Sequence, residues 1–181
     1  MRSDASDEAL VRRALAGSDS AWTKLVGRYQ QRVYNYALRM IGHPDDALDL
    51  MQEVFVGVLR NLPGYRGDGA FAAWLFRIAA YRCTDYLRRR RVAVPLDETA
   101  WDGVDGEAVE AEPRIDANRP IAMALAGLPA EQRHVVELKF FQEFTFDDIA
   151  GQLGISPNTA KTRLYGALRK LRQHEELKDA L

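Results

Sequence analysis

The feature that most constrains the fold of this chain is the spacing of its apolar residues, which recur every three or four positions over long stretches. Between residues 21 and 40 the pattern passes through Ala21, Leu25, Tyr29 and Val33. This period matches the turn of an α-helix and gives each helix one apolar side. The chain is therefore expected to be all-α, with its helices packed on those sides.

Caps and breaks divide the first half of the chain into four predicted helices. They cover about residues 7–16, 18–40, 44–62 and 70–91. Ser18 suits an N-cap, Pro44 suits the first turn of a helix, and Pro63-Gly64 stops the third helix. The apolar side of this third helix is expected to include Leu59. Together the four helices predict a first small domain over residues 1–92.

Charge is distributed unevenly along the chain, although the net charge is only −1. Residues 60–92 carry eight basic and two acidic side chains, whereas residues 93–118 carry one basic and eight acidic side chains. The acidic segment also lacks helical periodicity, so it is predicted to be a flexible, self-repelling linker. The opposite charges suggest a closed state in which this linker lies over the basic segment.

Helical patterns return beyond the linker, over residues 119–127 and 129–142, and two further helices follow. They predict a second, four-helix domain over residues 119–175, with a tail over residues 176–181. The expected fold is therefore two small helical domains joined by a flexible acidic linker.

The scarcity of reactive side chains excludes several functional classes. Cys83 is the only cysteine, and the three histidines, His43, His134 and His174, are scattered. Neither a disulfide nor a Cys/His metal cluster can form at a recognisable spacing, and no cofactor is expected. No apolar run approaches the length of about 18 residues that spans a bilayer, and the N-terminus has no apolar signal core. A cytoplasmic protein without membrane insertion is expected.

The strongest local motif covers residues 145–164. Thr145 with Asp148 caps a short helix, Gly154 suits the left-handed conformation that closes it, and Ser156-Pro157 opens the next helix. The result is a helix-turn-helix, a motif whose second helix enters the major groove of DNA. The candidate DNA-binding residues at its exposed start are Ser156, Asn158, Thr159, Lys161, Thr162 and Arg163. The alternative is an ordinary helical hairpin with a solvated basic side.

A second motif is an acidic stripe inside the helix predicted over residues 44–62. Asp49 and Glu53 follow Asp46 by three and seven positions and therefore share its side of the helix, with Gln52 beside them. The chain offers no evident partner residues that would turn the stripe into a metal or acid-base site. From these residues alone, a solvated helix side is the simpler interpretation.

A third motif is a glycine-rich loop over residues 62–69, followed by a helix in which aromatic residues alternate with arginines. Aromatic rings can stack on bases while guanidinium groups bind phosphates, so this combination suits single-stranded nucleic acid. The candidate residues are Gly64, Tyr65, Arg66, Gly67, Asp68, Trp74, Arg77, Tyr81, Arg88 and Arg89. The loop lacks a Gly-Lys-Ser/Thr ending and is not a P-loop. Alternatively, Phe71 and Trp74 belong to the core and the arginines only keep the surface soluble.

These three motifs, in this order, resemble the extracytoplasmic-function (ECF) subfamily of the sigma-70 family of bacterial RNA polymerase sigma factors. The resemblance covers nearly the whole chain apart from the linker and the extreme ends. It implies a non-catalytic subunit that binds core RNA polymerase and directs promoter-specific transcription initiation. Residues 46–59 would bind the polymerase, residues 71–91 would read and melt the −10 element, and residues 128–172 would read the −35 element.

The resemblance also assigns partners to individual residues. Core polymerase, through its β and β′ subunits, would be bound by Asp46, Asp49, Gln52 and Glu53. The loop of residues 64–69 would accept a flipped base of −10 DNA, and the candidates on the following helix would hold the adjacent strand. An anti-sigma factor is a further expected partner. Leu48 and Tyr81 depart from the family, which commonly has glutamate and asparagine there.

Two other functions are compatible with parts of the pattern. An autonomous helix-turn-helix regulator would bind operator DNA as a dimer, with residues 1–92 as a sensor or dimerisation domain. A nucleic-acid enzyme is disfavoured, because no catalytic carboxylate, histidine or metal cluster accompanies the basic segments. A regulator would bind duplex DNA by itself, whereas a sigma factor would need core polymerase.

Overall fold

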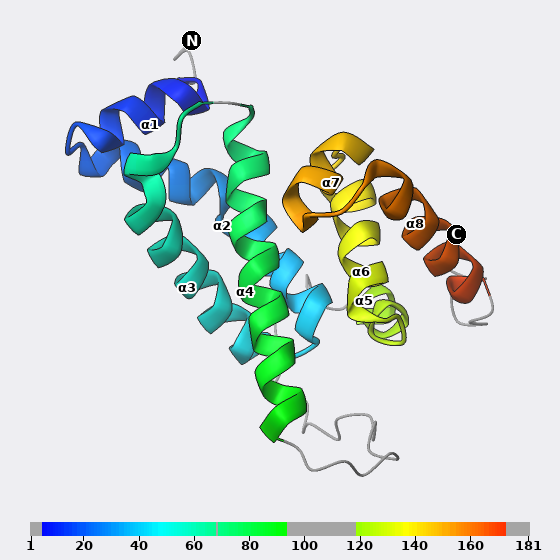
Figure 1. The fold of residues 1–181 in the computed structure, drawn as a ribbon. Coiled ribbons are helices and arrows are strands. Elements are labelled where there is room, and N and C mark those ends of the chain that lie inside the picture. Colours follow the sequence, from blue (N-terminus) through cyan, green and yellow to red (C-terminus); the bar gives the residue numbers. More distant parts are fainter. Residues whose placement is uncertain (1–4, 68, 94–118, 173–181) are drawn as a thin grey trace.

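The computed structural model describes residues 5–67, 69–93 and 119–172, and every regular element within these ranges is helical (Figure 1). The elements are α1 (Asp7–Leu15), α2 (Asp19–Ile41), α3 (Pro44–Asn61), η1 (Leu62–Gly64), α4 (Phe71–Ala93), α5 (Arg119–Ala126), α6 (Ala130–Val136), η3 (Glu137–Phe141), α7 (Phe146–Leu153) and α8 (Pro157–Leu171). The expected all-α fold class is confirmed. In the part of the chain that is described, no helix is both long and apolar enough to cross a membrane.

The helix boundaries in the first half follow the capping residues. The Ser18 hydroxyl accepts a hydrogen bond of 3.4 Å from the Ala21 amide at the start of α2, as predicted. Gly42, at φ +79°, ends the same helix in the left-handed conformation, and Pro44 lies in the first turn of α3. Each of the four predicted helices is found within two residues of its expected ends.

The N-terminal part, which comprises α1 to α4, packs around α2. Its core is built from the predicted apolar sides and includes Leu25, Val33 and Tyr36, each at most 1% exposed. Tyr29 of α2 meets Phe71 of α4 edge-on, with ring centroids 5.5 Å apart. Burial of a large apolar side chain stabilises a fold by roughly 1.5–3 kcal/mol, so this core fixes α3 and α4 in position.

The C-terminal part, which comprises α5 to α8, differs from expectation at one point. The helix predicted over residues 129–142 is α-helical only to Val136 and continues as the π-helix η3 from Glu137 to Phe141. Gln142 donates a hydrogen bond of 3.2 Å to Glu137, five positions earlier. Residues five apart lie on different sides of an α-helix, whereas the wider π turn aligns them. The prediction of one regular helix was therefore wrong, because apolar spacing does not reveal a widened turn.

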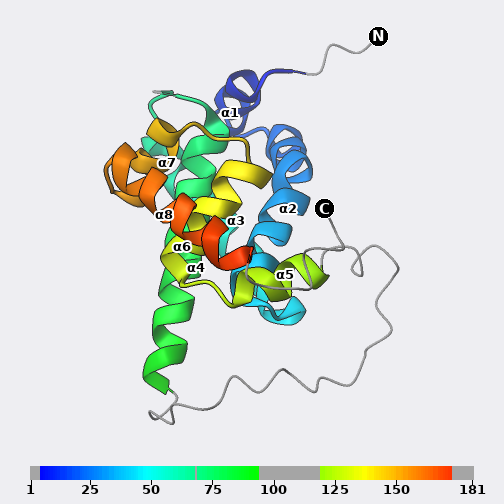
Figure 2. The same cartoon turned by 90° about the vertical axis from the view of Figure 1, so that its right-hand side faces the viewer.

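The two parts contact each other directly. α2 lies against α5 and α6, and α4 lies against α7, as Figures 1 and 2 show from two sides. The predicted acidic linker lies outside the described residues except for residue 93, and so does the predicted tail. The hypothesis that this linker covers the basic segment therefore stays a prediction.

Candidate nucleic-acid and partner interfaces

The predicted acidic stripe lies on α3, and one of its edges is held by α4. Asp46, with 40% of its side chain exposed, accepts a hydrogen bond of 2.5 Å from the Tyr86 hydroxyl. The Glu53 carboxylate is 60% exposed and lies 4.0 Å from the Arg82 guanidinium. The members that remain exposed on the other edge are Asp49 and Gln52. The stripe therefore has an anchored edge and an accessible one.

Three exposed apolar residues continue the accessible edge of the stripe. Leu48, Val56 and Leu59 are 45%, 47% and 52% exposed. The expectation that Leu59 faces the core was wrong, because its neighbours Val58 and Leu62 fill the core and are at most 2% exposed. At 100° per residue, the exposed residues share one side of the helix. We call Leu48, Asp49, Gln52, Val56 and Leu59 the α3 face.

The glycine-rich loop is held by a cluster of aromatic rings. The Tyr65 ring lies 5.7 Å from Phe71 and 5.1 Å from Trp74, measured between centroids. The Tyr65 hydroxyl donates a hydrogen bond of 2.9 Å to the Gly69 carbonyl. Gly67 and Gly69 adopt φ values of +77° and +101°, which favour glycine. Phe71 is buried and Trp74 half-buried, so only part of this cluster is core, and Trp74 keeps an accessible surface.

An open groove of about 470 Å³ lies beside this loop, between the end of α3 and the first half of α4. The structure brings four of the predicted residues together here, namely Gly64, Trp74, Arg77 and Tyr81. The other residues lining the groove are Gly57, Asn61, Ile78 and Arg82. The predicted residues Arg66 and Gly67 are exposed in the loop outside this lining, and Asp68 lies outside the described residues.

Gly57 shows why the groove exists at this position. A Cβ atom there would lie 3.4 Å from Ile78 Cγ2 and 3.6 Å from Arg82 Nη2, so a side chain would fill space that these residues now border. A glycine inside an otherwise regular helix indicates that another part of the chain comes close to the backbone there. Gly57 was therefore the clue to this groove that the sequence offered. Arg82 follows Ile78 by four positions in α4, so the helical period places both side chains on the side of α4 that lines the groove.

The basic end of α4 is ordered by one carboxylate. Asp85 forms ion pairs with Arg88 at 2.7 Å and with Arg89 at 2.6 Å, while both arginine side chains stay 75% exposed. The hydrogen bond from Arg88 holds the pKa of Asp85 below its ordinary value, and the charge of Arg89 adds to this effect. The two guanidinium groups therefore stand at the surface. Farther up the same helix, Arg77 is exposed and Tyr81 is 67% exposed.

The predicted helix-turn-helix is formed by α7 and α8. Thr145 and Asp148 form a reciprocal capping box, and Gly154 ends α7 at φ +66°. The Ser156 hydroxyl accepts a hydrogen bond of 3.0 Å from the Thr159 amide and caps α8. These caps are the ones that the sequence predicts, and they fix the angle at which α8 leaves the turn.

The exposed side of α8 differs in part from the predicted set. Asn158, Lys161 and Thr162 are exposed as expected, whereas Thr159 is half-buried. Arg163 is 25% exposed and forms an ion pair of 2.6 Å with Glu131 of α6. Two residues that the sequence prediction missed share the exposed side, and helical spacing of three and seven positions from Thr162 could have indicated them. They are Tyr165, which is 67% exposed, and Arg169.

Two family models match the two halves of this arrangement. Residues 25–92 match Sigma-70 region 2, which takes in the α3 face, the groove and the basic end of α4. Residues 118–171 match Sigma-70, region 4, which takes in the helix-turn-helix. The chain belongs to the sigma-70 family. This membership favours the sigma-factor hypothesis over the autonomous regulator and the nucleic-acid enzyme.

Individual relatives place this sigma factor in the ECF subfamily. The ECF RNA polymerase sigma factor SigE of Mycolicibacterium smegmatis is 32% identical over 85% of this chain and 61% of its own length. The RNA polymerase sigma-H factor of Pseudomonas aeruginosa is 29% identical over 92% of both chains. The ECF RNA polymerase sigma factor SigW of Bacillus subtilis is 26% identical over 90% of this chain and 93% of its own. The function of this sigma factor is accordingly promoter-directed initiation of transcription.

Solved structures show the same arrangement of helices. CnrH in complex with the cytosolic domain of CnrY is 27% identical, with a TM-score of 0.71 over 96% of this sigma factor and 97% of that chain. The sigma factor RpoE of Bartonella quintana, solved with the anti-sigma factor NepR, is 21% identical, with a TM-score of 0.66 over 86% and 96% of the two chains. The match to CnrH extends across both helical parts.

Proposed function

We propose that the α3 face is where this sigma factor binds core RNA polymerase, through the β′ subunit in particular, and that β supplies further contacts. Apolar side chains surrounded by polar ones are the usual anatomy of a protein interface. Leu48, Val56 and Leu59 would supply the buried area, and Asp49 and Gln52 would supply orientation. Asp46 and Glu53 would form the rim of this interface. Because both contact α4, they would also fix the position of α4 relative to the bound polymerase.

The groove and its loop are proposed to hold the melted −10 strand. A volume of about 470 Å³ admits a nucleobase, and Trp74 and Tyr81 offer rings on which bases can stack. Each stacked base contributes about 1–3 kcal/mol, which offsets an unstacking cost of a few kcal/mol for a flipped base. Arg77 and Arg82 line the same groove and would bind the phosphates of that strand. Melting then follows from tighter binding of single strands than of duplex.

The basic end of α4 and the C-terminal part would position the rest of the promoter. Arg88 and Arg89 would bind phosphates next to the melted segment. The exposed side of α8 would enter the major groove of the −35 element. Its proposed base- and phosphate-contacting residues are Asn158, Lys161, Thr162, Tyr165 and Arg169. Ser156, Thr159 and Arg163 would act mainly by holding this helix in place, because each is engaged in a contact within the C-terminal part.

We infer that residues 1–92 and 119–175 are the two working domains of this sigma factor, that it acts in the cytoplasm beside core polymerase, and that it makes or breaks no covalent bond. An anti-sigma factor is the proposed regulator. The similarity to CnrH, which was solved with the cytosolic domain of a second protein, supports a protein partner of this kind.

The observation that carries this proposal is the presence in one chain of an α3 face, an aromatic and basic groove, and a helix-turn-helix. The test is transcription in vitro from a pool of genomic promoter fragments, with core polymerase in the presence and absence of this protein. Specific transcripts only in its presence are expected. A shift of duplex DNA by the protein alone, without such transcripts, would favour an autonomous regulator.

A variant of the groove separates melting from recruitment. Trp74→Leu removes a stacking ring but keeps an apolar side chain, so promoter opening should fall about tenfold, the equivalent of one stacked base. On a template whose −10 region is already unpaired by mismatches, a larger share of activity should return. Equal loss on duplex and mismatched templates would mean that Trp74 acts only in the fold.

A further inference from the structure

Asp7, in the first turn of α1, binds two neighbouring side chains of α2. Its carboxylate accepts hydrogen bonds from the Arg28 guanidinium at 2.5 Å and, through the other oxygen, from the Tyr29 hydroxyl. Arg28 also donates to the Ala5 carbonyl at 3.0 Å, just before α1 begins. Only 21% of the Asp7 side chain is exposed, and hydrogen bonds to an ionised acceptor are among the strong ones. The beginning of α1 is therefore tied to the middle of α2.

Tyr29 links Asp7 to the aromatic cluster beside the groove. It is 4% exposed, and burial together with the bond to Asp7 raises the pKa of its hydroxyl, so the hydroxyl stays protonated and remains a donor. Its ring meets Phe71 edge-on, and the Arg32 guanidinium lies 5.5 Å from the ring centroid. A shift of the Tyr29 ring would therefore remove the surface against which Phe71 packs.

Phe71 is the first residue of α4 and follows the glycine-rich loop. It is 2% exposed, and its ring centroid lies 5.8 Å from that of Trp74 and 5.7 Å from that of Tyr65. Trp74 lines the groove, and Tyr65 holds the loop through the Gly69 carbonyl. The ring that Tyr29 contacts is therefore the one on which both of the more accessible rings pack.

A second contact joins α1 to the same loop. α1 lies against η1, with which the loop begins (Figure 1). Leu10 and Val11 of α1 and Leu62 of η1 are each at most 3% exposed. α1 therefore supports the loop at its start as well as at its end. This helix precedes residues 25–92, so the match to Sigma-70 region 2 gives it no role.

The glycine-rich loop benefits from support outside its own sequence. Gly67 and Gly69 adopt positive φ values, and glycine leaves the backbone more conformational freedom than any other residue does. A loop that is ordered before its ligand arrives binds more tightly, because binding then does not bear the entropy cost of ordering it. The contacts from α1 therefore supply order that the glycines themselves do not provide.

We propose that Asp7 is a positioning residue for the melted −10 strand. Through the Tyr29 hydroxyl, it fixes the position of Phe71. Phe71 in turn holds the Tyr65 and Trp74 rings in the orientation that accepts a base. The inference rests on the proposed −10 role of the groove, and it assigns α1 to the same site. Loss of the Asp7 contact reduces the fraction of molecules with a competent loop, and the apparent affinity for the strand falls by that fraction.

Asp7→Ala and Tyr29→Phe remove the two ends of the same hydrogen bond and test the proposal in the full-length chain. Glu8→Ala is the matched control, because Glu8 is exposed and is the other acidic residue in the first turn of α1. The probe is a single-stranded oligonucleotide with the −10 sequence of a promoter that the wild type transcribes, bound by each protein together with core polymerase.

Asp7→Ala and Tyr29→Phe should each raise the dissociation constant of the oligonucleotide at least about fivefold, as loss of a hydrogen bond to a charged group allows. Glu8→Ala should leave it unchanged. The double variant should bind no more weakly than Asp7→Ala alone, since both changes remove one shared contact.

Two further measurements separate positioning from a general loss of structure. The affinity for core polymerase should not change, because the α3 face does not include the altered residues. The second measurement uses protein with Trp22→Phe and Trp101→Phe, which leaves Trp74 as the only tryptophan. Acrylamide should quench its fluorescence more strongly in the two variants than in the wild type or the control.

Equal losses of affinity for core polymerase and for the oligonucleotide would overturn the positioning role, and so would an effect of Glu8→Ala as large as that of Asp7→Ala. Unchanged quenching of Trp74 would also contradict it. A wild-type protein that supports no specific transcript would instead count against the proposed function. The quenching of Trp74 would still decide whether Asp7 orders the aromatic cluster.

Discussion

Acidification from about pH 7.5 to about pH 5.5 should destabilise the native protein through His134. Burial lowers the pKa of this ring from its ordinary value of 6.5 to about 3, and the charges of Arg133 and Arg163 add to the shift. The ring therefore stays neutral in the native state over the whole interval. In the unfolded chain it titrates near 6.5 and gains a proton. Because the unfolded state binds more protons, the free energy of unfolding falls as the pH falls.

The size of this effect depends on the unfolded state alone, since the native pKa lies far below the interval. At about pH 5.5 an unfolded-state histidine is protonated about ten times more often than it is neutral, which corresponds to a loss of about 1.4 kcal/mol relative to about pH 7.5. Tyr36 and Thr84 contact the ring, and neither carries a charge in this interval. Glu137 acts in the opposite direction, because a raised native pKa favours the native state as the pH falls.

Urea unfolding at both pH values measures this difference when the wild type is compared with His134→Asn. The variant lacks the titrating ring but retains Glu137 and every other carboxyl, so subtraction of its pH dependence isolates His134. The wild type should lose about 1.4 kcal/mol more of its free energy of unfolding than the variant between the two pH values. Equal losses in both proteins would refute the assignment of a neutral, buried imidazole to this position.

Joint replacement of Asp49 and Gln52 by alanine should weaken binding to core polymerase at least about tenfold in a titration, with an unchanged helical circular-dichroism spectrum, since both side chains are exposed. If Lys161 contacts a phosphate, Lys161→Ala should weaken −35 binding to a similar extent across DNA sequences and reduce by about 1 the slope of log affinity against log salt concentration. A loss of affinity confined to one base position would indicate base recognition instead. Gly154→Ala should lower the free energy of unfolding by about 1–2 kcal/mol because of its positive φ, while Gly151→Ala in the open interior of α7 should raise it by up to about 1 kcal/mol. Thermal unfolding of both glycine variants checks this pair, and effects of the same sign would contradict it.

Local chemistry explains why the helices were predictable. The caps at Ser18, at Thr145 with Asp148, and at Gly154 depend on residues within a few positions of one another, and all three are found. The groove was partly predictable for the same reason, since Trp74 and Tyr81 recur on one side of one helix. The opposite wall of the groove comes from α3, and local spacing does not say which side of one helix meets another.

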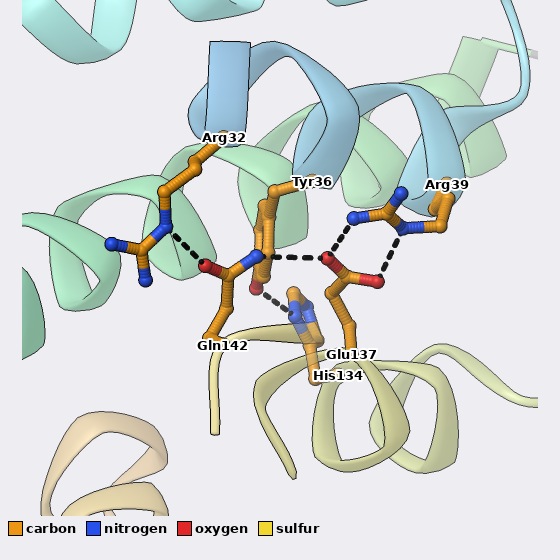
Figure 3. A network of polar contacts seen from close by, with 6 residues as sticks. All are labelled: Arg32, Tyr36, Arg39, His134, Glu137 and Gln142. Carbon is orange, nitrogen blue, oxygen red and sulfur yellow. Dashed lines mark hydrogen bonds and ion pairs between the residues drawn. The ribbon is translucent and has the colours of Figure 1, made fainter. Parts of the chain in front are cut away.

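The polar contacts between the N-terminal and C-terminal parts (Figure 3) could not be predicted, because the residues that form them are far apart in the sequence. Arg39 and Glu137 are separated by 98 positions, and so are Tyr36 and His134. Charged residues are ordinarily found at the surface, so hydropathy gives no reason to expect that Arg39 and Glu137 form a buried pair. Leu59 shows the converse error, since an apolar residue at a helical period can face a partner rather than the core.

The π-helix η3 gives the contact between the two parts a dependence on chain length. Glu137 and Gln142 meet because the turn between them holds one residue more than an α-helix would need. Loss of a single residue from this turn would allow an ordinary helix to form and would rotate Gln142 away from Glu137 and Arg32. The capped turn and the exposed side of α8 lie beyond this point and would keep their own geometry. Loss or gain of one codon could therefore change the contact between the two parts without altering any residue that is proposed to face DNA.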